Sequence, residues 1–133
     1  MAYYVRLYVV TLIALVAIDM AWIGLVARSF YRSYLGFLMA ARVNWLAAAI
    51  FYLLFVLGIL VFVVLPGLDG HSVGASLLRA ALFGLVAYAT YDLTNLATIK
   101  GWPAIVTVVD LAWGTVVSVV VSYVGLTAGR LFR

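Results

Sequence analysis

Long runs of apolar residues dominate this chain, and polar residues interrupt them only briefly. An α-helix rises 1.5 Å per residue, so about 20 apolar residues cross the hydrocarbon core of a bilayer. Runs of this length predict four spans, at residues 4–27, 43–65, 76–98 and 103–128. Backbone groups in lipid must be paired within the segment, which favours helices over open strands. The pattern predicts an all-α integral membrane protein, a four-transmembrane-helix bundle in a single domain over 1–133.

The connections between the spans carry turn and cap signals. Residues 66–76 ("PGLDGHSVGAS") form a turn-rich loop in which Ser76 is suited to cap the third helix. Residues 99–103 ("IKGWP") predict a tight hairpin, with Gly101 in a left-handed turn and Pro103 at the first helical position. So short a connection makes the third and fourth helices antiparallel neighbours.

The segment between the first two spans, 28–42 ("RSFYRSYLGFLMAAR"), has a different composition. Aromatic residues recur there at helical spacing, and Arg28 and Arg32 lie one turn apart. This pattern predicts an interfacial amphipathic helix that lies on the membrane surface. The alternative is an ordinary connecting loop with aromatic residues at the membrane interface.

Composition narrows the class of function. The chain has 133 residues, of which 69% are hydrophobic and 9% are charged, far below the charged fraction of soluble domains. The absence of cysteine excludes disulfides and thiolate chemistry, and the single histidine, His71, excludes a histidine metal cluster. The net charge of +4 suits anionic lipid headgroups, and no basic patch typical of nucleic-acid binding is present. We therefore expect membrane lipids as partners, no nucleic acid and no cofactor.

Basic residues do not set the orientation of the spans. An even number of spans places both termini and the 66–76 loop on one side of the membrane. The two sides then carry four basic residues each: Arg6, Arg79, Arg130 and Arg133 on one, and Arg28, Arg32, Arg42 and Lys100 on the other. The positive-inside rule gives no preference for such a tie.

Three of the four acidic residues fall inside predicted spans. Asp92 lies about six residues before the end of the third span, or roughly 9 Å, and Asp110 about seven residues after the start of the fourth, or roughly 10 Å. Asp19 lies about eight residues before the end of the first span, or roughly 12 Å. Given the directions of the helices, all three carboxyls are expected at similar depth in one leaflet. An aspartate near a helix centre costs about 2.5–3.5 kcal/mol to insert, so three at one depth indicate a working site.

The sequences around these aspartates share a short pattern. Residues 17–26 ("AIDMAWIGLV") and 108–117 ("VVDLAWGTVV") both contain D-x-x-W, which puts each acid and its tryptophan on one helical face. We predict a cluster of carboxylates surrounded by aromatic rings. Further polar side chains are expected beside the carboxylates, and mostly basic residues are expected at the entrance, or mouth, of the site. The predicted ligand-binding residues are Asp19, Trp22, Tyr88, Asp92, Asn95, Thr107, Asp110 and Trp113, and those at the mouth are Arg28, Arg42, Asn44 and Lys100.

Two packing interpretations stand beside this one. Buried aspartates also tie membrane helices together through hydrogen bonds, for instance to indole N–H groups. Residues 125–129 ("GLTAG") match the G-x-x-x-G helix-contact motif, which leaves contact between copies of the chain in a homo-oligomer open.

The long motif "ATYDLTNLATIKGWP" (89–103), with "SFYRSYLG" (29–36) and the two D-x-x-W motifs, resembles an uncharacterised bacterial family of small four-span membrane proteins, domain-of-unknown-function family 2177. The resemblance extends over essentially the whole chain. It implies a small integral protein of the bacterial inner (plasma) membrane, and it implies no particular activity.

Three functions remain open from the sequence. The first is binding or transport of a cationic or hydrogen-bonding, partly apolar small molecule at the aspartates. The second is a membrane enzyme that modifies a lipid or isoprenoid, with aspartates as general acid and base or as Mg²⁺ ligands. The third is a non-catalytic accessory subunit of a membrane complex, in which the acids serve only helix packing. No metal site and no catalytic residue is predicted, and the first function is favoured.

Overall fold

The computed structural model describes residues 1–133, and every element in it is helical. In chain order the elements are α1 (Ala2–Ala21), the π-helical segment η1 (Trp22–Ala27), α2 (Arg28–Leu35), α3 (Trp45–Ile59), the π-helical segment η2 (Leu60–Val64), α4 (Leu65–Leu68), α5 (Val73–Thr98) and α6 (Ala104–Phe132). They join into four helices long and apolar enough to cross a membrane: Ala2–Leu35, Trp45–Leu68, Val73–Thr98 and Ala104–Phe132. The predicted four-helix membrane bundle is confirmed.

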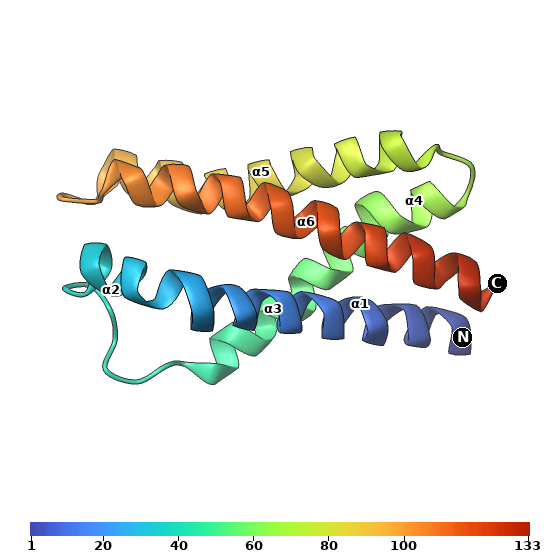
Figure 1. Ribbon diagram of the computed structural model, residues 1–133, viewed down its shortest axis with the longest axis horizontal. Coiled ribbons are helices and arrows are strands. Elements are labelled where there is room, and N and C mark those ends of the chain that lie inside the picture. The colour runs from blue at the N-terminus through green and yellow to red at the C-terminus, as the bar shows by residue number, and fades with distance from the viewer.

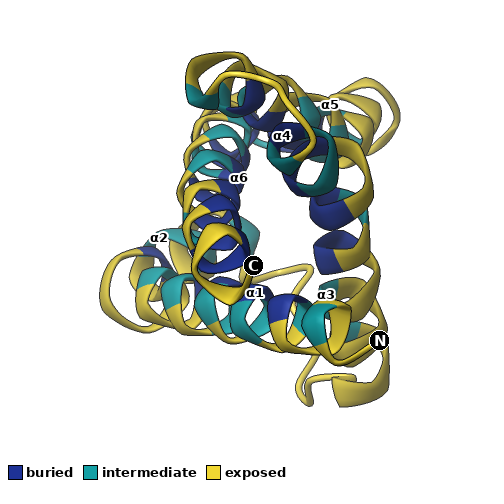
Figure 2. Cartoon of the chain, turned by 90° about the vertical axis from the view of Figure 1, so that its right-hand side faces the viewer, coloured by how far each residue is buried: buried dark blue, intermediate teal, exposed yellow.

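Three of the four helices run along one long axis of the bundle, and the second, from α3 to α4, crosses it obliquely (Figure 1). Both termini lie at one end of the bundle, and α2 and the turn between α5 and α6 lie at the other (Figure 1). Buried residues face the interior of the bundle, and exposed residues cover its outside (Figure 2). Large apolar side chains are among the most exposed, including Leu25 at 85% and Leu78 at 73%. A lipid solvent explains this outer surface, because acyl chains accept apolar side chains that water would not.

The first helix is longer than predicted. It continues without a break from η1 into α2 and ends at Leu35, because residues 25–35 contain no proline or glycine. Residues 36–44 contain no helix. The prediction of an interfacial helix over 28–42 is therefore corrected. Only residues 28–35 of that segment are helical, and they extend the first span.

Caps and turns account for the other helix ends. Ser72, rather than the predicted Ser76, caps α5, since its hydroxyl accepts a hydrogen bond from the backbone N–H of Ala75 at 3.2 Å. The predicted left-handed turn at Gly101 is confirmed by a φ of 79°. Pro103 is the N-cap of α6 rather than its first helical residue.

Small residues bring α5 and α6 into close contact. A Cβ atom on Gly84 would overlap the carbonyl oxygen of Gly114 and the hydroxyl of Ser118. A Cβ atom on Gly114 would overlap the ring of Tyr88. The hairpin predicted from the short 99–103 turn is therefore tightly packed along its length, and this packing fixes where the Tyr88 ring lies.

The G-x-x-x-G residues are used inside the chain. Gly125 and Gly129 are both buried, and a Cβ atom there would meet Val64 and Leu68 of the second helix. The hydroxyl of Tyr3 also donates to the carbonyl oxygen of Gly129 at 3.1 Å. The motif holds α6 against two other helices of the same chain.

The α5–α6 contact makes a direct prediction. Gly84→Ala should destabilise the protein by about 1–3 kcal/mol, because the added methyl group has no room. Thermal unfolding in detergent, followed by circular dichroism, measures the change. Gly74→Ala on the same helix is the matched control, since a Cβ there meets nothing within 4 Å. Equal stability of the two variants would contradict close packing at Gly84.

Candidate functional site

The largest cavity of the bundle lies between the helices that carry the three buried aspartates. Its volume is about 690 Å³. The carboxyl-bearing residues Asp19 of α1, Asp92 of α5 and Asp110 of α6 all line it. The remaining lining residues are mostly aromatic or small: Trp22, Ile23, Tyr31, Phe51, Phe55, Ala87, Tyr88, Thr90, Tyr91, Thr94 and Trp113. No lysine, arginine or histidine is among them.

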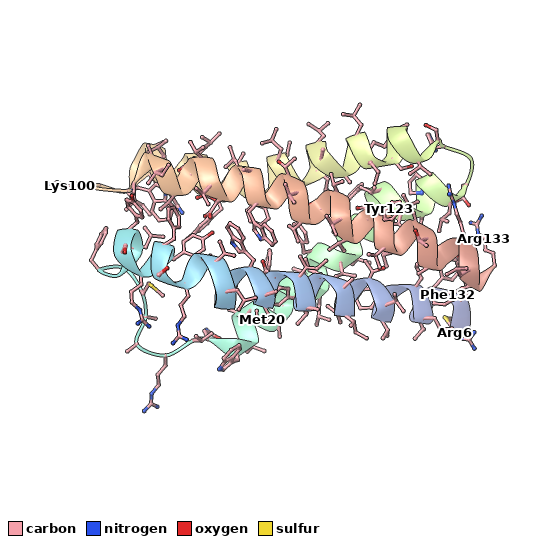
Figure 3. The ribbon with its side chains drawn as sticks, viewed as in Figure 1. Arg6, Met20, Lys100, Tyr123, Phe132 and Arg133 are labelled. Atoms are coloured by element: carbon pink, nitrogen blue, oxygen red, sulfur yellow. The ribbon has the colours of Figure 1, made fainter.

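Asp19 is held by donors from two other helices. The hydroxyl of Tyr52 on α3 donates to its Oδ2 at 2.5 Å, and the indole N–H of Trp113 on α6 donates to its Oδ1 at 3.0 Å. The side chain is 7% exposed. The neighbouring Met20 lies on the outside of the bundle (Figure 3). Asp19 thus joins three of the four spans at one point.

Asp110 has one donor, and it comes from the end of the first span. The hydroxyl of Tyr31 on α2 donates to its Oδ1. This bond ties α2 to α6. Asp110 and Asp19 therefore both form the interhelical hydrogen bonds that a packing role requires.

Asp92 differs from the other two aspartates. It is completely buried, and no hydroxyl or N–H group of the chain donates to either of its carboxyl oxygens. Its carboxyl lies within hydrogen-bond reach of the carboxyl of Asp110, across the α5–α6 contact. Asp92 is therefore the one of the three aspartates that receives no hydrogen bond from a hydroxyl or N–H group of another helix, and its negative charge has no compensating donor.

Aromatic rings form the walls of the cavity. Trp22 and Trp113 stack face to face, with ring centroids 4.4 Å apart and ring planes 8° apart. Each belongs to a D-x-x-W motif, but Trp113 bonds to the aspartate of the other motif rather than to its own. The indole N–H of Trp22 is buried and has no partner. Tyr88 meets the edge of Phe55 at 6.1 Å between centroids.

The π-helical segment η1 explains how the first helix contributes so many side chains. Trp22 and Tyr31 are nine residues apart, which in a regular α-helix is two and a half turns and puts them on opposite sides. The wider turns of η1 reduce the rotation between them. Both side chains consequently line the cavity.

Several predicted site residues lie outside the cavity lining. Thr107 donates to the backbone carbonyl of Asp92 at 3.3 Å and accepts from the indole of Trp102 at 3.1 Å, so it fastens the hairpin. Asn95 is half-buried, and its amide nitrogen has no partner. Six of the eight predicted ligand-binding residues line the cavity, and these two do not.

The four residues predicted at the mouth are not among those that line the cavity. Arg28, Arg42 and Lys100 are exposed and line no part of the cavity. Lys100 lies at the outer tip of the turn between α5 and α6 (Figure 3). Asn44 caps α3 instead, where its side chain accepts from the N–H of Ala47 at 3.1 Å. The longer first helix explains this in part, because Arg28 continues that helix rather than turning over the aspartates.

Sequence reasoning missed the two tyrosines that hold the aspartates. Tyr52 sits in an apolar run and Tyr31 in the segment assigned to the interface. Their partners are 33 and 79 residues away in the chain. The one local signal was the aromatic spacing of residues 29–36, which indicated a helical face but not what the face would meet.

The hydrogen bonds to Asp19 generate a test of their contribution. Tyr52→Phe should destabilise the bundle by about 1–3 kcal/mol, because it removes one of two donors to a buried acid. Denaturant unfolding in detergent micelles measures the change. Tyr123→Phe is the matched control, since Tyr123 is 54% exposed on the lipid-facing surface. If both variants unfold alike, the Tyr52–Asp19 bond contributes nothing to stability.

Comparison with known proteins agrees with the fold. The sequence profile of a family described as "Predicted membrane protein (DUF2177)" matches residues 4–127. No curated protein and no solved structure matches the chain. The match covers nearly the whole chain and confirms the resemblance seen in its motifs. This chain belongs to the DUF2177 family of predicted membrane proteins.

Proposed function

We propose that this protein binds a partly apolar organic cation in the cavity between α1, α5 and α6. The observation that carries the proposal is Asp92, which is fully buried, lines a cavity of about 690 Å³ and receives no hydrogen bond from any hydroxyl or N–H group of the chain. A cationic group on a ligand is the partner that such a carboxylate lacks. The bacterial inner membrane is the proposed location.

The charge of the lining selects for a cation. Asp19, Asp92 and Asp110 contribute three acids, and no basic side chain lines the cavity to balance them. An anionic ligand would meet only like charge there. A neutral ligand without hydrogen-bonding groups would leave Asp92 as costly as it is in the empty bundle.

The walls suit the apolar part of the same ligand. A volume of about 690 Å³ falls within the roughly 300–1,000 Å³ of small-molecule sites. The faces of aromatic rings attract cations, most strongly for tryptophan and for quaternary ammonium groups. The stacked pair Trp22 and Trp113, with Tyr88 nearby, supplies such faces.

The three aspartates have different tasks in this proposal. Asp19 and Asp110 already accept hydrogen bonds from other helices and hold the walls in position. Asp92 is the counter-ion of the ligand. Without ligand it is the neutral acid, because an unpaired buried charge is the costlier form, and a proton leaves it when the cation binds. Exchange of a proton for a cation at one carboxyl is the step that would couple binding to transport.

The structure gives less support to the two other functions. Arg28 and Arg42, which a lipid-modifying enzyme would use to hold a phosphate, lie outside the cavity lining. The three aspartates do not come together as one set of three ligands for a metal ion. The bonds of Asp19 and Asp110 do favour an accessory subunit whose acids join helices, so the experiment must separate that role from binding.

Two ions of equal size and opposite charge test the proposal. Tetraphenylphosphonium should bind to the purified protein in nonionic detergent, and tetraphenylborate should not. Asp92→Asn should weaken binding by at least about tenfold, which corresponds to about 1.4 kcal/mol. Isothermal titration calorimetry measures affinity, and titration in weak buffer measures the proton released.

Controls separate a site from general attraction to an acidic protein. Asp69→Asn removes an exposed acid far from the cavity and should leave the affinity unchanged. Equal binding of the two ions, or full binding and proton release in Asp92→Asn, would refute the proposal. The accessory subunit would be favoured by two results together: the unaltered protein binds no cation, and Asp92→Asn is as stable as the unaltered protein.

A further inference from the structure

A second concave site lies on the outside of the bundle, along η1 and the start of α2. Its volume is about 460 Å³. It lies toward the end of the first helix that is remote from both termini (Figure 1). The groups that matter in it are two guanidinium groups, of Arg28 and Arg32, and two hydroxyls, of Ser29 and Ser33.

The charge of this groove is uncompensated. Arg28 and Arg32 are one helical turn apart and both exposed, and like charges at this spacing repel each other. No acidic residue lines the groove, and the ion pair of the chain joins Arg133 and Asp69 instead. An anion between the two guanidinium groups would turn this repulsion into attraction.

The donors in the groove match a phosphate group. Guanidinium groups offer paired N–H donors in a planar fork that fits two phosphate oxygens, and adjacent arginines reach the same anion. The hydroxyls of Ser29 and Ser33, also one turn apart, add two further donors. The set contains donors for several phosphate oxygens and no competing carboxylate.

The apolar part of the groove indicates a lipid rather than a free ion. Leu25 and Val26 line it one turn nearer the middle of the first span, and they are 85% and 58% exposed. The groove thus runs from apolar to basic along a helix that is long enough to cross a membrane. Basic residues at the end of such a helix lie at the level of anionic headgroups.

We infer that Arg28, Arg32, Ser29 and Ser33 form a binding site for the phosphate headgroup of an anionic phospholipid, whose acyl chain lies against Leu25. None of these residues lines the aspartate cavity, so the site is independent of the proposed cation binding. Tyr31, between the two arginines in sequence, bonds to Asp110, so an occupied site would also steady one wall of that cavity.

A lipid titration with matched arginine variants tests this inference. The full chain in nonionic detergent is titrated with fluorescent phosphatidylglycerol and with fluorescent phosphatidylcholine, and anisotropy reports binding. Arg28→Gln with Arg32→Gln should weaken phosphatidylglycerol binding by about tenfold, because both guanidinium partners of the phosphate are lost. Each single variant should weaken phosphatidylglycerol binding by about threefold. The single variants replace the double variant in the test if the double variant does not fold.

Arg6→Gln with Arg130→Gln is the control, because it removes the same net charge from exposed arginines near the two termini, which lie at the opposite end of the bundle. It should bind phosphatidylglycerol like the unaltered protein, and phosphatidylcholine should bind weakly to all. Equal losses in the two double variants would show attraction to net charge alone and overturn the site. Displacement of the lipid by millimolar inorganic phosphate would show a free-anion site and overturn the assignment to a lipid.

Discussion

The carboxyl of Asp19 is the point on which this bundle depends. It accepts hydrogen bonds from Tyr52 on α3 and Trp113 on α6 while it belongs to α1, so three of the four spans meet at one side chain. In lipid the apolar contacts between helices have no hydrophobic driving force, and polar bonds and close packing decide which faces meet. The Asp19 bonds set the position of Trp113, and with it the stack on Trp22 that forms one wall of the cavity.

Close packing supplies the opposite wall, and it leaves one acid without a partner. Gly84 and Gly114 let α5 and α6 approach until Tyr88 lies against the α6 backbone. Asp92 lines the cavity from this hairpin, and no hydroxyl or N–H group donates to its two oxygens, whereas the two other aspartates have such donors. An acid that costs insertion energy and faces another acid, with no hydroxyl or N–H donor, is the side chain that a packing role explains least well. The cation proposal rests on this difference among the three aspartates.

The fold could be predicted largely from hydropathy, whereas only part of the site could. Apolar runs indicated four spans because span length follows from bilayer thickness, and the 99–103 turn indicated the antiparallel hairpin. Helix periodicity suggested a common depth for the aspartates, and all three line one cavity. It did not reveal Tyr31, because the π-helical turns of η1 change the phase between it and Trp22. The sequence also placed Arg28 and Asn44 at the mouth of the cavity. In the structure Arg28 continues the first helix, and Asn44 caps α3.

The most direct test of the central claim is chemical cross-linking between the aspartate positions, since the chain has no cysteine of its own. Two double variants are made, one with Asp19→Cys and Asp92→Cys and one with Asp92→Cys and Asp110→Cys. Each is treated with a short bifunctional thiol reagent, and mass spectrometry of the monomer measures the intramolecular product. The control is the double variant Asp92→Cys with Val108→Cys, because Val108 is 63% exposed on α6. Convergence predicts high yield for both aspartate pairs and low yield for Cys at 92 with Cys at 108. Equal yields for all three pairs, or no product between 19 and 92, would show that these acids do not share a cavity.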